Sequence, residues 1–199
     1  MWRDTLKVIF IDRKKVGIVI IILGLMITLL GISKRFDDKL KTSILVENNI
    51  NLLSDYGALN GKVSYKLPAG WITKEKKFPG DEIMYHNDFQ SPDGVIHGFV
   101  EVWKSRQGLK EFLDTSKNIS EQQNTIKNYK IDSIAINGKK VYLVQYLIKV
   151  SDNNWYKSYE YFIDGDKEFY RFSFFTRSVN FKEAYGAIFE SIVGTLKIN

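Results

Sequence analysis

The sequence predicts an α+β fold, in which helices cover an antiparallel sheet, attached to one N-terminal transmembrane helix. Three patterns indicate this architecture: an uncharged apolar segment near the N-terminus, a series of alternating strands, and a C-terminal segment with an apolar stripe at helical spacing. The chain has 199 residues, of which 44% are hydrophobic and 14% aromatic. That length and composition suit a single domain with a substantial core.

The apolar segment, residues 16–32, reads VGIVIIILGLMITLLGI and contains no charged residue. At 1.5 Å per residue it spans about 26 Å, close to the thickness of a hydrocarbon core. It lacks the polar stripe that a buried helix of a soluble protein has. We therefore predict a transmembrane anchor at 16–33, after a short basic cytoplasmic segment at 1–15. Positive residues before the span favour a cytoplasmic N-terminus, which predicts a single-pass protein of the cell membrane with an extracytoplasmic C-terminal domain.

The same segment has a candidate signal-peptide cleavage site and a face of small residues. Gly31 and Ser33 offer the small residues of a signal-peptide cleavage site, but the apolar run is longer than such peptides use, which favours an uncleaved anchor. Gly17, Gly24, Gly31 and Thr28 lie on one helical face, which suggests a homodimer through this face. Glycine is also common in membrane helices that do not pair in this way.

Composition excludes several classes of function. The chain has no cysteine, so disulfides, thiolate metal sites and cysteine nucleophiles are ruled out. The net charge of +6 is shared between the flank of the apolar segment and the rest of the chain, without a dense Lys/Arg stripe. Binding to nucleic acid is therefore not expected.

Residues 34–61 are predicted to form a stalk or a packed helical connector. Phe36, Leu40 and Ile44 have helical spacing, and Leu52, Leu53 and Tyr56 suggest a second short helical piece. The connector is expected to end near Gly57 to Gly61, where glycines break the pattern.

Residues 62–199 are predicted to form the soluble domain, beginning with strands. The Ser91-Pro92-Asp93-Gly94 turn and the Asn137-Gly138 pair are turn signals between strands. The last four strands follow one another as an antiparallel meander. The expected strands are 63–67, 83–87, 96–103, 129–136, 141–150, 155–163 and 169–177.

Two helices are expected to cover this sheet. Leu109, Phe112, Leu113 and Ser116 share one face of the first. The second is predicted to begin at Asn180, with Glu183 reaching back in a capping box, and to end at Gly194. Its apolar stripe consists of Phe181, Ala184, Tyr185, Ile188, Phe189, Ile192 and Val193.

Taken in order, these segments resemble the PsbP-like family, named for an extrinsic subunit of the photosynthetic oxygen-evolving complex. The resemblance rests on a strand that runs into Pro-x-Gly-Trp at 65–71, a helix after the early strands, an aromatic-rich meander, and a C-terminal helix with Phe-Glu-Ser-Ile at 189–192. It covers 62–199. It implies an α/β/α sandwich and a non-enzymatic accessory, assembly or binding protein, and it implies no photosynthetic role.

The only two histidines give one candidate metal site. If Ser91 lies opposite Gly94, then Asp88 faces His97 and His86 faces Phe99, so that His86, Asp88 and His97 share one face of a hairpin. Glu101 lies further along the same face. Such a group can hold a divalent metal. The alternative is an ordinary solvated polar face.

Other chemistry finds little support. No Gly-x-Ser-x-Gly and no phosphate-binding glycine loop is present, so no catalytic residue and no cofactor are predicted. Aromatic residues line both faces of the strand at 155–163, as core or as a ligand groove. The leading prediction is a membrane-tethered, extracytoplasmic, non-enzymatic binding or assembly module with a protein or envelope partner. A cell-envelope hydrolase and a metal-binding structural or sensor domain are the alternatives.

Overall fold

The computed structural model describes residues 53–105, 108–165 and 167–199. The predicted cytoplasmic segment, the transmembrane anchor with its glycine face, and most of the connector lie outside the described residues and stay predictions. Within the described ranges, no helix has both the length and the apolar character needed to cross a bilayer.

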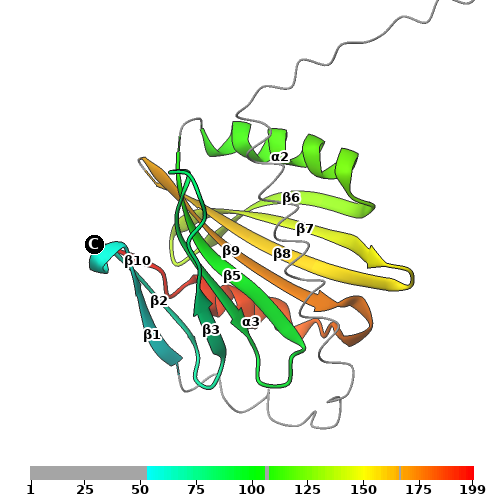
Figure 1. Ribbon diagram of the computed structural model, residues 1–199, viewed down its shortest axis with the longest axis horizontal. Coiled ribbons are helices and arrows are strands. Elements are labelled where there is room, and N and C mark those ends of the chain that lie inside the picture. The colour runs from blue at the N-terminus through cyan, green and yellow to red at the C-terminus, as the bar shows by residue number, and fades with distance from the viewer. Residues whose placement is uncertain (1–52, 106–107, 166) are drawn as a thin grey trace, which may run out of the picture.

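A seven-stranded antiparallel sheet with the strand order β3-β4-β5-β9-β8-β7-β6 forms the centre of the fold (Figure 1). A smaller sheet has the order β1-β2-β10. The strands are β1 (Leu53–Ala58), β2 (Val63–Pro68), β3 (Ile72–Glu75), β4 (Ile83–Gln90), β5 (Ile96–Lys104), β6 (Ile126–Ile136), β7 (Lys139–Ser151), β8 (Asn154–Asp164), β9 (Glu168–Arg177) and β10 (Lys197–Ile198). The helices are α2 (Leu109–Gln123) and α3 (Ala184–Val193), with short 3-10 turns η1 (Leu59–Gly61) and η2 (Ser178–Asn180).

The predicted meander is confirmed, since β6, β7, β8 and β9 pair in sequence order. Its first hairpin turns at Asn137 and Gly138, whose φ values of 49° and 75° are both positive. A two-residue turn of this kind matches the right-handed twist of the strands, which is why Asn-Gly is the strongest hairpin signal in a sequence.

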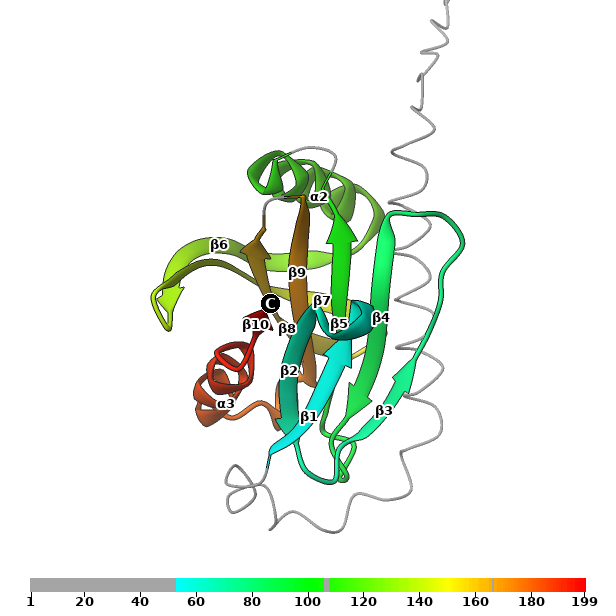
Figure 2. The same cartoon turned by 90° about the vertical axis from the view of Figure 1, so that its left-hand side faces the viewer.

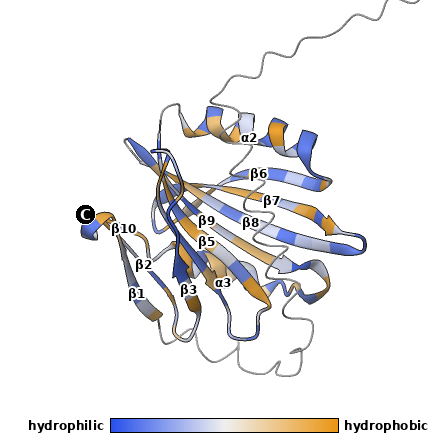
Figure 3. Ribbon diagram, in the orientation of Figure 1, coloured by the Kyte–Doolittle hydropathy of each residue, from blue (hydrophilic) through white to orange (hydrophobic). Residues whose placement is uncertain are grey.

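The two faces of the large sheet are covered differently (Figure 2). The small sheet and α3 cover one face and form the main core, in which Phe172, Phe174 and Phe189 are almost fully buried. On the other face, α2 packs its predicted residues Leu109, Phe112 and Leu113 against the sheet. Hydrophobic and hydrophilic residues alternate along α2, as expected for a helix with one face on a sheet (Figure 3). The α+β prediction with helices on both sides is thus confirmed for the described part of the chain.

Three local predictions differ from the structure. The piece at Leu53 and Tyr56 is not helical but is strand β1, because it pairs with β2 from Leu53 opposite Pro68 to Ala58 opposite Val63. Cross-strand pairing here outweighs a helical spacing that rested on only a few residues.

The C-terminal helix also starts later than predicted. Asn180 lies in η2 and Phe181 has an extended backbone, so Asn180 does not cap the helix and Glu183 takes the N-cap position. Phe181 nevertheless stacks on Tyr159, with ring centroids 5.4 Å apart, which places it against the core without helical geometry. The helix ends at Gly194 as predicted.

The third difference is the register of the β4–β5 hairpin. Asp88 lies opposite Phe99 and Gln90 opposite His97, two residues away from the expected pairing. Gly94 does close a turn onto Ser91, with its N–H 2.9 Å from the Ser91 carbonyl oxygen. However, Ser91 itself pairs with Ile96, because its N–H donates to the Ile96 carbonyl and its hydroxyl accepts from the Ile96 N–H. The connection is therefore longer than the sequence suggested.

Candidate functional site

A line of charged and polar side chains runs across the α2-facing side of the large sheet, between two apolar patches. It crosses β4, β5, β9, β8 and β7, which are consecutive in the sheet. We call it the charge network. It consists of Lys76, His86, Asp88, Glu101, Trp103, Tyr146, Glu160, Arg171 and Ser173.

His86 lies between two carboxylates. Its Nδ1 is 2.7 Å from Glu101 Oε1 and its Nε2 is 2.7 Å from Asp88 Oδ1. A neutral imidazole has only one N–H, so only the protonated ring donates to both carboxylates. Burial lowers the pKa of His86, but the hydrogen bonds to Asp88 and Glu101 outweigh that effect and raise the pKa above its ordinary value. The arrangement therefore favours a buried imidazolium.

Glu101 is the most enclosed carboxylate of the network, with 0% of its surface exposed. Besides His86, it accepts from Trp103 Nε1 at 2.7 Å and from Arg171 Nη1 at 3.3 Å. The exclusion of water from a charge is costly unless every oxygen has a donor, and here both oxygens have one. Glu101 is therefore held in one position by three neighbours.

Arg171 connects this half of the network to Glu160. Its Nε donates to Glu160 Oε2 at 2.7 Å, and its Nη2 also forms an ion pair with that carboxylate. Its guanidinium lies 4.9 Å from the Phe99 ring centroid and 5.4 Å from that of Phe162. Burial lowers the pKa of Arg171, but the charges of Glu160 and Glu101 raise it by more than burial lowers it, so the guanidinium stays charged.

The network ends differently on its two sides. At the inner end, Glu160 accepts hydrogen bonds from Ser173 Oγ at 2.9 Å and from the Tyr146 hydroxyl. At the outer end, Asp88 forms an ion pair with Lys76, whose side chain is 28% exposed. Burial raises the pKa of Asp88, but His86 and Lys76 outweigh burial and lower it. Three positive and three negative groups then alternate along the line when His86 is protonated.

The predicted metal residues are only partly brought together. His86 and Asp88 are in direct contact, on the face that the alternation predicted. His97 lies on the same face but against the rings of Tyr156 and Phe175, at 5.4 Å and 6.0 Å between centroids. Burial lowers the pKa of His97 to about 4. Within 53–105, 108–165 and 167–199, no three His, Asp or Glu side chains are arranged to hold a metal ion. A metal bound by His86, Asp88 and His97 stays a prediction.

This face is not the solvated polar face of the alternative reading. His86, Glu101 and His97 are all buried. Alternation along β5 places Glu101 on the face of the two histidines, but no local pattern in the sequence indicates that Arg171, Glu160 and Tyr146 belong to the same network. Alternation along β7, β8 and β9 puts these three side chains on one face, and the strand order then brings them next to Glu101.

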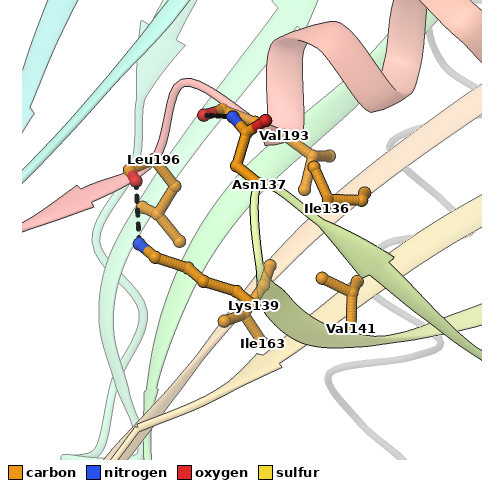
Figure 4. Close-up of a pocket in the computed structure, with 8 residues that line it drawn as sticks. Ile136, Asn137, Lys139, Val141, Ile163, Val193 and Leu196 are labelled. Atoms are coloured by element: carbon orange, nitrogen blue, oxygen red, sulfur yellow. Dashed lines mark hydrogen bonds between the residues drawn. The ribbon is translucent and has the colours of Figure 1, made fainter.

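A small pocket lies at the other side of the sheet, between the β6–β7 hairpin and the end of α3 (Figure 4). Its volume is about 80 Å³, and its lining is mostly aliphatic. Lys139 Nζ donates to the Leu196 carbonyl at 3.1 Å and Asn137 Nδ2 donates to the Gly194 carbonyl at 2.9 Å. Both polar groups at the pocket are therefore used to hold the hairpin to the C-terminal segment. The lining residues are Ile136, Asn137, Lys139, Val141, Ile163, Val193, Gly194 and Leu196.

Solved structures of other proteins share this fold, although no sequence comparison finds a relative. No protein-family model matches the chain, and no curated protein matches its sequence. Among solved structures, the solution structure of cyanobacterial PsbP (CyanoP) from Synechocystis sp. PCC 6803 is similar over 80% of this chain and 99% of that one, with 14% identity and a TM-score of 0.53. A crystal structure from Bacteroides thetaiotaomicron is similar over 73% of this chain, with 14% identity and a TM-score of 0.51, and the match spans 48% of that protein. The described domain therefore has a PsbP-like fold, as the sequence suggested.

Proposed function

We propose that this protein is a membrane-tethered, extracytoplasmic module that binds or assembles with a protein or envelope partner and does not catalyse a reaction. The PsbP-like fold is consistent with a non-catalytic binding module. Fold alone does not assign a function, so the proposal also needs support from the side chains.

The observation that carries the proposal is the way the chemically capable groups are used. The charge network contains the acids, the imidazole and the guanidinium that catalysis would need, but these groups pair with one another, and the charged side chains of the network are most exposed at its outer end, at Lys76 and Asp88. The side chains of His86 and Glu101 are 0% exposed. A general acid or base has to come within hydrogen-bonding distance of its substrate, and side chains without exposed surface cannot reach a substrate in this arrangement. The network suits a rigid sheet that presents its edges and loops to a partner.

The tether is supported by the sequence. An uncharged span at 16–32 with positive residues before it is typical of a membrane anchor whose following domain lies outside the cytoplasm. A domain held at a membrane meets its partners at a high effective concentration, so weak contacts suffice for assembly.

The location can be tested by thiol labelling, because the chain contains no cysteine. Ala135 is exposed on edge strand β6, so that Ala135→Cys in the full-length protein offers a single thiol. We expect a membrane-impermeant maleimide to label this thiol in intact cells and the protein to stay in the membrane fraction after alkaline extraction. Labelling only after cell lysis would contradict the extracytoplasmic location.

The non-catalytic part is tested by acid-to-amide substitutions. Each exposed Asp or Glu is changed in turn in a strain that lacks the chromosomal copy, and restoration of its phenotype is measured. Loss of a general acid or base lowers an enzyme's activity by about 100-fold to 10,000-fold. A binding module is expected to tolerate each exchange, whereas total loss at one or two positions in a folded variant would favour the hydrolase.

A further inference from the structure

One end of the large sheet lies next to the place where the N-terminal segment joins the domain. Leu53, at the start of β1, is opposite Pro68 at the end of β2, and β3 starts close by at Ile72. The β4–β5 connection and the end of β9 are at the same end, since Gln90 pairs with Ile72 and Ile96 with Thr176. Figure 2 shows these connections together at the lower end of the molecule. We call this region the Leu53 end.

The Leu53 end carries the two most exposed large hydrophobic side chains of the described residues. Ile72 on β3 is 67% exposed, and Val179 in η2 is 83% exposed. β4, β5 and β9 follow β3 in the sheet, so strands β3 and β9 are about 14 Å apart at about 4.8 Å per strand, and η2 directly follows β9. Half-buried aromatic residues are close to both in sequence: Trp71 directly precedes Ile72, and Phe181 is two residues after Val179.

Basic residues accompany the apolar ones. Lys182 is exposed three residues after Val179. Lys157 lies 3.7 Å from the Phe181 ring centroid and 3.6 Å from Glu183. Apolar side chains flanked by aromatic rings and lysines match the chemistry of the bilayer interface, where rings sit at headgroup level and lysines meet anionic lipid.

We propose that the Leu53 end faces the bilayer, with Ile72 and Val179 inserted at the boundary between headgroups and acyl chains. Scattered exposed hydrophobic residues are normal on soluble proteins, so exposure alone would not support this. Both side chains also lie at the end where the chain leaves the domain toward the predicted span. Only residues 33–52 separate that span from Leu53, so the domain lies within about 70 Å of the span even at the greatest reach of a chain of that length.

This inference rests on the proposed tether, and it predicts which surface stays available to a partner. If the Leu53 end contacts lipid, then α2 at the opposite end points away from the membrane, and the β6–β7 hairpin lies at the side of the domain (Figure 2). Edge strand β6 and that hairpin then become the surfaces that a partner protein can reach.

The test uses the full-length protein in nanodiscs that contain phosphatidylcholine and phosphatidylglycerol. Single cysteines replace Ile72, Val179 or Ala135, and each carries an environment-sensitive fluorophore. Ala135 is the matched control because it is exposed but lies at the far end of the sheet. Quenching by a lipid with a nitroxide near its headgroup is compared with quenching by iodide in solution.

We expect lipid quenching at positions 72 and 179 and iodide quenching at position 135. In the Ile72→Ser background, the ratio of lipid-contacting to free domain, read at position 179, should fall by about tenfold, since one buried aliphatic side chain is removed from the contact. Iodide quenching at all three positions in a chain that is inserted in the discs would overturn the inference and leave the tether intact. Protection at 72 and 179 from both quenchers would also overturn it, in favour of contact with a second copy. Failure of the chain to enter the discs would instead refute the proposed tether.

Discussion

Replacement of Arg171 by methionine tests whether the charge network holds the sheet together. Arg171 pairs with Glu160 and Glu101, at 2.7 Å from Nε to Glu160 Oε2 and 3.3 Å from Nη1 to Glu101 Oε2. Arg171→Met fills much of the same space but leaves the buried Glu160 without a cation and Glu101 with His86 alone. The result should be a large loss of stability, because an unpaired charge in the interior is costly.

The size of the effect follows from the two ion pairs. Unit charges about 4 Å apart attract by about 4 kcal/mol at an effective dielectric constant of about 20, so two pairs contribute about 8 kcal/mol. The removal of water from the guanidinium offsets several kcal/mol of this, which leaves a net loss of about 3–5 kcal/mol. At a urea dependence of about 2 kcal/mol/M, the midpoint of unfolding moves by about 2 M.

The assay is urea unfolding of the detergent-solubilised full-length protein, followed by tryptophan fluorescence. Trp103 donates to Glu101 and so reports on the network itself. Lys66→Met is the control, since the Lys66–Asp55 pair is exposed and its loss should cost no more than about 1 kcal/mol. Addition of Glu160→Gln to Arg171→Met should restore part of the stability by removing one stranded charge. Equal urea midpoints for Arg171→Met and Lys66→Met would mean that the buried ion pairs of Arg171 do not stabilise the sheet.

Three further predictions concern single positions. The pKa of His86 is raised in the folded state, so its contribution to stability is complete below the ordinary value of 6.5 and is lost as the pH rises through the higher folded-state pKa. Urea midpoints of the wild type should therefore fall as the pH rises through this range. The fall should be smaller in His86→Gln, which lacks the titrating group. Gly98→Ala should cost about 1–3 kcal/mol or prevent folding, because its new Cβ would meet the Ser173 carbonyl oxygen at 1.8 Å, whereas Gly57→Ala meets nothing within 4 Å and should unfold near the wild-type midpoint. Phe189→Ala should lower the unfolding free energy by about 3–5 kcal/mol, since that ring is 1% exposed and stacks on the core.

Each of these has an outcome that contradicts it. A pH dependence unchanged in His86→Gln would mean that another group titrates. Equal stability of Gly98→Ala and Gly57→Ala would mean that the strands do not approach as closely as the structure places them. A small loss for Phe189→Ala, comparable to that of a surface exchange, would mean that α3 is not packed on the main core.

The sheet was predictable where alternating residues and turn motifs indicate the same strand pairs that the structure contains. Along β7 and β8, alternation and the Asn137-Gly138 turn specify adjacent antiparallel strands without knowledge of the rest of the fold. Strand β1 was not predictable in this way, because Leu53 and Tyr56 also fit a helix over so short a stretch. Its partner β2 and the β10 strand, which closes the small sheet, decide its conformation.

The charge network shows where sequence reasoning reaches its limit. Alternation placed His86, Asp88 and Glu101 on one face, and the structure agrees. Arg171 is 70 residues from Glu101 in sequence, so their contact depends on β9 pairing with β5 instead of following the chain order. The register of the β4–β5 hairpin was missed because Ser91 pairs with Ile96 and not with Gly94, which makes the connection longer than expected.

The binding-module proposal can be tested by crosslinking in intact cells with a membrane-impermeant, cleavable lysine reagent. The full-length protein is then purified, and the proteins crosslinked to it are identified by mass spectrometry. We expect one extracytoplasmic or envelope partner to be recovered reproducibly and in near-equal amount, crosslinked through lysines outside the Leu53 end such as Lys130 on β6 or Lys140 on β7. A protein whose lysines react with the reagent in intact cells but that is recovered without any partner would contradict the binding-module proposal.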